Sequence, residues 1–97
     1  MNYLFNSNGE PVGFWRGRYI YALNGNPVGQ LNGSHAHALS GGYVGELHRD
    51  MIVDKHLGNF GNIGNPGNPG NPGSPGHPGN RGAMNYGYSD VFDKLLS

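Results

Sequence analysis

Apolar positions recur every 16 residues along roughly the first 64 residues of the chain. Three apolar columns result: Leu4, Ile20, Ala36 and Ile52; then Val12, Val28, Val44 and Phe60; then Trp15, Leu31, Leu47 and Ile63. Each copy opens with a short aromatic or β-branched segment, which suits the pleated and half-buried surface of a strand. A fixed period indicates one supersecondary unit repeated four times, of which no copy can bury its apolar face alone.

Turn signals separate the apolar segments. Asn8-Gly9 and Asn24-Gly25 are typical of a two-residue hairpin turn in which both central residues have positive φ, and Ser40-Gly41-Gly42 takes this place in the third copy. A second turn is expected near Arg16-Gly17 and Asn32-Gly33. The pattern predicts an all-β meander of some eight short antiparallel strands, without helical periodicity.

A glycine column accompanies the apolar ones: Gly13, Gly29, Gly45 and Gly61. Side chains alternate along a strand, yet Val12 and Trp15 both lie in apolar columns three positions apart. Either a β-bulge at the glycine or a close approach of neighbouring backbones explains this spacing. Four hairpins with an in-phase apolar stripe can close around an axis, which removes exposed sheet edges.

The segments Leu4-Phe5-…-Asn8-Gly9-Glu10-Pro11-Val12-Gly13 and Ile20-Tyr21-…-Asn24-Gly25-Asn26-Pro27-Val28-Gly29 resemble the units of the four-fold β-flower family, a set of small bacterial domains. The resemblance covers about residues 3–64, and the fourth copy departs from it with Leu57 at the position of the turn glycine. It implies a small flower-like barrel of four hairpins around a short apolar channel. It implies no catalytic residues, because the family has no established activity.

After the repeats, glycine occurs at every third position, with proline closing many of the triplets. The chain therefore divides into a four-repeat β domain (1–63), a collagen-like Gly-X-Y segment (64–82) and a C-terminal segment (83–97). The middle segment is expected either to be a single-chain polyproline-II spacer or to form a triple helix that trimerises the protein. The end is expected to form a short helix capped by Ser89, in which Phe92, Leu95 and Leu96 share one face; it either frays or docks on the barrel.

Charge and composition exclude several classes of protein. Six basic and six acidic residues leave no net charge, and without clustered Lys and Arg we expect no nucleic-acid partner. The chain has no cysteine and hence neither a disulfide nor a thiolate metal site. No segment has the length of apolar residues needed to span a bilayer. We see no signal peptide at the N-terminus, so a cytoplasmic location is the default expectation.

Histidine and carboxylate residues offer little chemistry. His35 and His37 point to the same face of one strand, but they are weak metal ligands because no Asp or Glu lies beside them in the third copy to orient an imidazole. Glu46 lies in a variable column, where a solvated charge is expected. Ser34, Ser40, His48 and Asp50 lack the sequence context of a catalytic triad. We expect no enzyme, no cofactor and no metal.

Aromatic side chains are the best candidates for ligand binding: Tyr3, Phe5, Phe14, Tyr19 and Tyr21. Rings on one side of a small barrel could hold a lipid tail, a sugar or a peptide. The competing interpretation is that they pad a thin core. The sequence predicts a non-enzymatic binding module that holds an apolar or lipid-like group in its channel or on its aromatic face. The alternative is a structural protein that self-associates through the Gly-X-Y tail.

Overall fold

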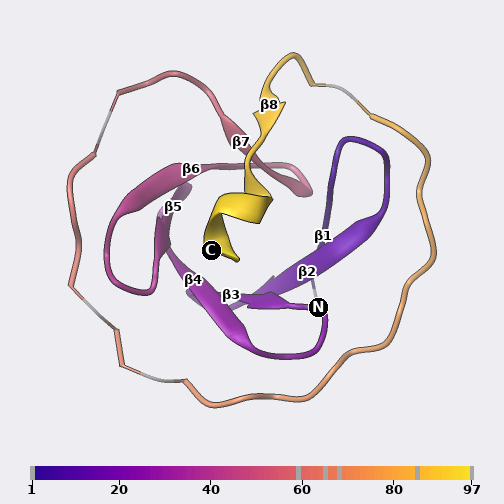
Figure 1. The fold of residues 1–97 in the computed structure, drawn as a ribbon, viewed down its shortest axis with the longest axis horizontal. Helices are drawn as coiled ribbons and strands as arrows, with labels where there is room; N and C mark the ends of the chain where they lie inside the picture. Colours follow the sequence, from indigo (N-terminus) through magenta and orange to yellow (C-terminus); the bar gives the residue numbers. More distant parts are fainter. Residues whose placement is uncertain (1, 59, 65, 68, 85, 97) are drawn as a thin grey trace.

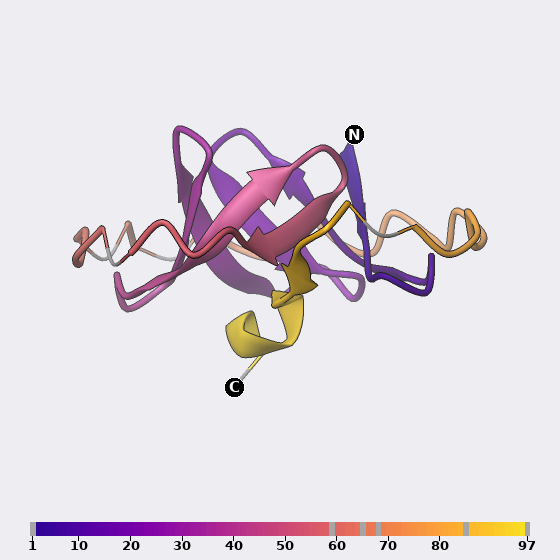
Figure 2. The ribbon, with the colours of Figure 1, turned by 90° about the horizontal axis from the view of Figure 1, so that it is seen from above.

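An antiparallel meander of strands curls around an axis, and the C-terminal end of the chain lies at one end of this axis (Figures 1 and 2). The computed structural model describes residues 2–58, 60–64, 66–67, 69–84 and 86–96. Its elements are β1 (Asn2–Phe5), β2 (Pro11–Arg16), β3 (Tyr19–Ala22), β4 (Pro27–Asn32), β5 (His35–Ala38), β6 (Tyr43–His48), β7 (Met51–Asp54), β8 (Ser89–Asp90) and the 3-10 turn η1 (Phe92–Leu95). The eight strands pair in sequence order and curl into a half-barrel. The predicted all-β hairpin meander is confirmed.

Each repeat forms a hairpin, here named a petal: β1–β2, β3–β4, β5–β6 and β7–β8 are petals 1 to 4. At the tip of petal 1, the Gly9 N–H donates to the Asn6 carbonyl and the Asn6 N–H donates to the Glu10 carbonyl. Gly9 has φ +83°, whereas Asn8 does not have positive φ. The tip is therefore a three-residue loop that ends in a left-handed glycine, and the predicted two-residue turn with two positive φ angles is wrong.

The glycine column shows both a β-bulge and a close approach of neighbouring backbones, the two alternatives that the sequence left open. In petals 1 to 3 the pairing register shifts by one residue just before the glycine, as between Leu4–Gly13 and Phe5–Pro11, which marks a bulge. A Cβ on Gly13 would also lie 2.2 Å from the Tyr21 carbonyl oxygen and 2.7 Å from Phe92 Cζ. The glycine thus allows the neighbouring strand and the end of the chain to approach.

The core lies inside the half-barrel and includes the C-terminal end. Leu4, Ile20, Ala36 and Ile52 are fully buried there. Val91, Phe92 and Leu95 pack against them; residues 91–96 are named the plug below. Ser89 belongs to β8, and the Asp90 side chain accepts the Phe92 N–H at 3.1 Å, so the prediction of a helix capped by Ser89 is wrong. Among the described residues, no helix has the length and apolarity to cross a membrane.

Petal 4 pairs β7 with β8, two strands that lie far apart in the sequence. In petals 2 and 3 the Leu31 and Leu47 N–H groups donate to the carbonyls of Arg18 and Ser34. The equivalent Asp50 carbonyl accepts from the Phe5 N–H of petal 1 at 2.8 Å, not from Ile63.

Phe60 and Ile63 therefore do not belong to the apolar columns as predicted. Phe60 is 45% exposed, and Ile63 lies outside the sheet. Leu57 stands where the other tips need a left-handed glycine, so the chain leaves β7 without turning back.

Residues 55–88, named the belt, encircle the petals and return to β8 (Figures 1 and 2). Seven of its glycines, at positions 67, 70, 73, 76, 79, 82 and 87, have φ between +80° and +90°. This conformation differs from the expected polyproline-II segment, in which φ is about −75° throughout. Side chains close local turns instead: Asn71 Oδ1 accepts the Gly73 N–H at 2.7 Å and His77 Nδ1 accepts the Gly79 N–H at 3.0 Å. The structural unit is thus X-Pro-Gly.

Candidate functional site

The five aromatic residues predicted as ligand contacts lie on the outer face of petals 1 and 2, which the belt covers. The Tyr3 and Tyr19 hydroxyls donate to the carbonyls of Pro75 (3.1 Å) and Pro66 (3.4 Å). The Arg81 guanidinium lies 5.0 Å from the centre of the Phe5 ring. Phe14 and Tyr21 are buried and stack with ring centres 4.9 Å apart. The structure thus brings all five together, and their role toward a ligand from outside stays a prediction.

The plug closes one end of the channel that the resemblance implies, with Val91, Phe92 and Leu95 in the core (Figure 2). Its side chains rest on the glycine column, where a Cβ at Gly29 would lie 3.0 Å from Leu95 and one at Gly45 would lie 2.8 Å from Val91. Phe92 occupies the corresponding place beside Gly13. The chain itself therefore supplies an apolar group to the interior.

Petal 3 carries a buried polar cluster that the sequence did not predict. Glu46 is only 3% exposed and accepts hydrogen bonds from His35 Nδ1 (2.6 Å), the Tyr43 hydroxyl (2.7 Å) and Ser34 Oγ (3.0 Å). The expectations that Glu46 is solvated and that no carboxylate neighbours His35 are wrong, because the two residues are cross-strand partners in the β5–β6 ladder. Phe60 of the belt stacks on His35, with ring centres 3.9 Å apart.

Hydrogen bonds favour the ionised form of the Glu46 carboxylate. Burial alone would raise the pKa of Glu46, but the hydrogen bonds from His35, Tyr43 and Ser34 outweigh burial and hold the pKa below its usual value. Burial, followed by the bond to Glu46, raises the pKa of the Tyr43 hydroxyl. The Glu46 carboxylate accepts three hydrogen bonds, of which the one from His35 connects the two strands of petal 3.

His37 is fully buried, and its Nδ1 lies 2.9 Å from the Gly41 carbonyl oxygen. Since a carbonyl only accepts, Nδ1 carries a proton, and Nε2 has no hydrogen-bond partner among the residues that the structure describes. His35 and His37 both contact the Tyr43 ring, so they do share a face. In the part of the chain that the structure describes, no three or more His, Cys, Asp or Glu side chains gather as a metal site.

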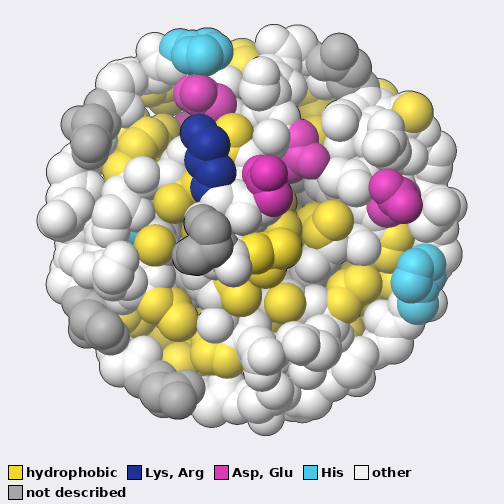
Figure 3. All heavy atoms as spheres, viewed as in Figure 1, with side chains coloured by type: hydrophobic (Ala, Val, Ile, Leu, Met, Phe, Trp, Pro, Cys, Tyr) yellow, Lys and Arg dark blue, Asp and Glu magenta, His cyan; other side chains and the backbone are white. Residues whose placement is uncertain are grey.

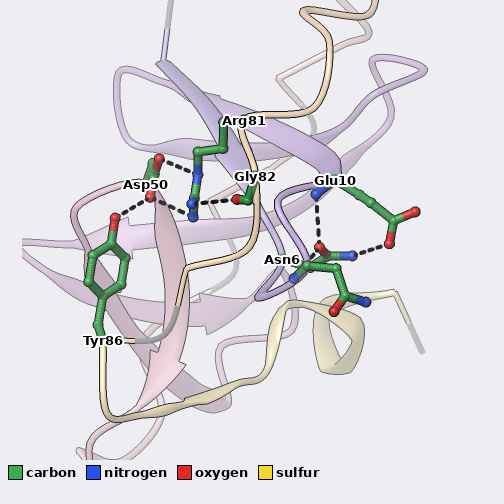
Figure 4. A network of polar contacts seen from close by, with 7 residues as sticks. Asn6, Glu10, Asp50, Arg81, Gly82 and Tyr86 are labelled. Carbon is green, nitrogen blue, oxygen red and sulfur yellow. Dashed lines mark hydrogen bonds and ion pairs between the residues drawn. The ribbon is translucent and has the colours of Figure 1, made fainter.

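Asp50 fastens the far end of the belt (Figure 4). Its Oδ2 pairs with Arg81 Nε at 2.8 Å, and its Oδ1 accepts from Arg81 Nη2 at 3.2 Å and from the Tyr86 hydroxyl at 3.0 Å. Burial, and then the hydrogen bond to Asp50, raises the pKa of Tyr86. These three residues are named the latch. A weak signal for the latch is present in the sequence, because Arg81 is the only charged residue of the Gly-X-Y segment (64–82).

Two open grooves flank the plug on the face of Figure 3, where apolar side chains gather near the centre. The first, of about 460 Å³, lies between petal 1 and β8 and is lined by Asn6, Ser7, Val12, Ser89, Asp90, Phe92, Asp93 and Leu96. The second, of about 440 Å³, lies between petals 2 and 3 and is lined by Asn26, Pro27, Val28, Ala38, Leu39, Ser40, Leu95 and Leu96. Leu96 borders both grooves and is 56% exposed.

These grooves are not among the sites that the sequence predicts. The signal that was present is the shared face of Phe92, Leu95 and Leu96, which the structure divides: Phe92 and Leu95 enter the core, and Leu96 remains outside. The grooves form only where the plug meets the petals, so no local pattern marks them.

Comparison with protein families gives one result. A family model described as 4-fold beta flower protein matches residues 2–89. The match extends across the belt as far as the first residue of β8. No curated protein and no solved structure matches the chain significantly.

Proposed function

The chain belongs to the 4-fold beta flower family, and from this premise we propose that it is a non-enzymatic binding module that holds an apolar chain, such as a lipid acyl group, in the grooves beside its plug. The observation that carries the proposal is Leu96, which stands 56% exposed between two grooves of about 440 and 460 Å³. Volumes of 300–1,000 Å³ are typical of small-molecule sites.

The lining of the grooves suits an amphipathic ligand. Val12 and Phe92 in the first groove, and Val28 and Leu39 in the second, offer apolar contact. Each buried methylene of a ligand contributes about 0.8 kcal/mol, so even a partly covered acyl chain gains several kcal/mol. Polar residues at the first groove, such as Asn6 and Asp90, can contact the hydrated head group of such a ligand.

The proposed ligand position differs from the channel expected from the sequence, because the plug closes one end of that channel. We do not propose assembly through a collagen-like triple helix. Every belt glycine except Gly64 has positive φ, and belt carbonyls accept hydrogen bonds from Tyr3, Tyr19 and Gln30. Releasing the belt to wind with other chains would break these contacts.

The test is a titration of the full chain with a fluorescent long-chain fatty acid. Leu96→Asp should weaken binding about tenfold or more, which corresponds to about 1.4 kcal/mol. Leu57→Asp is the matched control, because Leu57 is 55% exposed but lines neither groove. Equal affinity of the two variants, or no binding by the unmodified chain, would contradict the proposal.

A further inference from the structure

The belt meets the petals at regular intervals. At petal 3 the Ile63 N–H donates to the Gly41 carbonyl, and at petal 1 the Arg81 N–H donates to the Gly9 carbonyl, both at 3.0 Å. At petal 2 the Asn71 side chain donates to Asn26 Oδ1 at 3.0 Å. The steps from 63 to 71 and from 71 to 81 are eight and ten residues. The two steps average nine residues, so about three triplets of the belt span one petal.

The face beneath the belt has the chemistry of a proline-rich peptide site. Tyrosine hydroxyls of petals 1 and 2 donate to proline carbonyls of the belt, and aromatic rings form the floor. Aromatic grooves also bind proline-rich segments in the polyproline-II conformation, which have little conformational freedom to lose. The belt has a different conformation, with glycines of positive φ, but its local turns restrict its freedom in the same way. The belt is held in shape by its own X-Pro-Gly turns, and the floor by the sheet, so each side of the contact is formed independently.

Petal 1 makes the most specific contacts. Tyr3 binds the Pro75 carbonyl, the Phe5 ring lies under the Arg81 guanidinium, and Asp50 pairs with that same guanidinium. The proline and the arginine are six positions apart in the belt. A carboxylate and a ring around one guanidinium select arginine over lysine, because only the planar fork can pair and stack at once.

We propose that the outer face of petal 1, with Asp50, is a binding site for two X-Pro-Gly triplets followed by an X-Arg-Gly triplet on another polypeptide, and that residues 74–82 of the belt occupy this site in cis. The site is separate from the grooves beside the plug. Because a tethered segment has a high effective concentration, the chain's own belt excludes a competing segment until the latch is weakened.

The experiment uses the full chain and a fluorescein-labelled peptide with the sequence of residues 74–82, followed by fluorescence anisotropy. Arg81→Gln releases the belt from Asp50 but keeps the carboxylate for the arginine of the peptide. Asp50→Asn releases the belt equally but removes that carboxylate. We expect R81Q to bind the peptide at least tenfold more tightly than either the unmodified chain or D50N, and a peptide of the same composition in scrambled order to bind at least tenfold more weakly.

Equal binding of both peptides, or equal binding by R81Q and D50N, would overturn the proposal. A dimer of the unmodified chain that forms with rising concentration, without peptide binding by R81Q, would also overturn it and identify belt exchange between copies instead. Circular dichroism verifies that each variant is folded. Should R81Q not fold, Tyr86→Phe removes one bond of the latch and must still raise peptide affinity above that of the unmodified chain; no increase would overturn the proposal.

Discussion

The ring of Phe92 lies against Gly13, so closely that a Cβ on this glycine would come within 2.7 Å of the ring carbon Cζ. The two residues stand at opposite ends of the chain, and their contact seats the plug on the first petal. Leu95 and Val91 meet Gly29 and Gly45 in the same manner. The repeated glycine therefore has two roles: it lets neighbouring strands of the half-barrel approach, and it makes room for the side chains of the plug.

Gly13→Ala should lower the free energy of unfolding by about 3 kcal/mol, because overpacking at a site bounded by a carbonyl and a buried ring forces both to move. Gly42→Ala is the control: its φ is not positive, and the nearest atom to a new Cβ is 3.9 Å away. The control should stay within about 0.5 kcal/mol of the parent. Urea unfolding gives both values, and coinciding midpoints would speak against the seated plug.

Glu46 should make the protein acid-sensitive. Its folded-state pKa lies below the usual value, so the stability it contributes is complete above the unfolded pKa of about 4.3 and is lost as pH falls through the folded pKa. Glu46→Gln should cost about 1–3 kcal/mol at pH 7. The difference from the parent should shrink below about pH 4. Denaturant unfolding between pH 3 and 7 measures it, and a difference that does not change with pH would refute the role of the charge.

Arg49→Gly should stabilise the protein by about 0.5–1 kcal/mol. Arg49 has φ +57° in the turn after petal 3, and the equivalent turns after petals 1 and 2 have Gly17 at +61° and Gly33 at +64°. A left-handed conformation of a residue other than glycine costs about 1–2 kcal/mol. The contact of Arg49 with the Tyr86 ring offsets part of the gain. Arg49→Ala removes the same cation but keeps the Cβ, so thermal melting should show no stabilisation for it.

Asn71 should anchor the belt to petal 2. Asn71→Ala removes the turn to Gly73 and the bond to Asn26, and should cost about 1–2 kcal/mol. Ser74→Ala removes only a local turn to Gly76 and should cost about half as much or less. Hydrogen exchange around Asn24 and Gly25 would report the loosened contact; equal effects of the two substitutions would argue that the belt does not rest on this petal.

The petals could be predicted because they repeat locally in the sequence. Petal 4 and the belt could not, because they depend on contacts between segments far apart in the sequence. The column from Leu4 to Ile52 is buried as expected, since a fixed period places one residue of each copy inside. The pair Val53–Asp90 joins strands that the whole belt separates. Two residues of β8 show no alternation from which a strand could be predicted. Phe60 and Ile63 are in phase with the repeat in the sequence, but both lie in the belt, outside the strands.

The candidate site was partly foreseen for the same reason. The aromatic residues of petals 1 and 2 do share a face, as strand alternation predicts. Burial of Gln30 and Glu46 could not be foreseen, because Gln30 donates to the Gly64 carbonyl of the belt and Glu46 accepts from Ser34, contacts between residues distant in the sequence. The latch joins Asp50 to Arg81, and the grooves form where Leu96 meets two petals; neither relationship has a sequence period.

The most direct test of whether residues 89–96 complete the flower is the urea unfolding of a chain that ends at Ile63, compared with the full chain. Without β8, the plug and most of the belt, the remaining petals lose Val91, Phe92 and Leu95 from the core. We expect no cooperative unfolding transition for the shortened chain. A cooperative transition at the midpoint of the full chain would show that the first 63 residues fold alone and would contradict the central role of the plug.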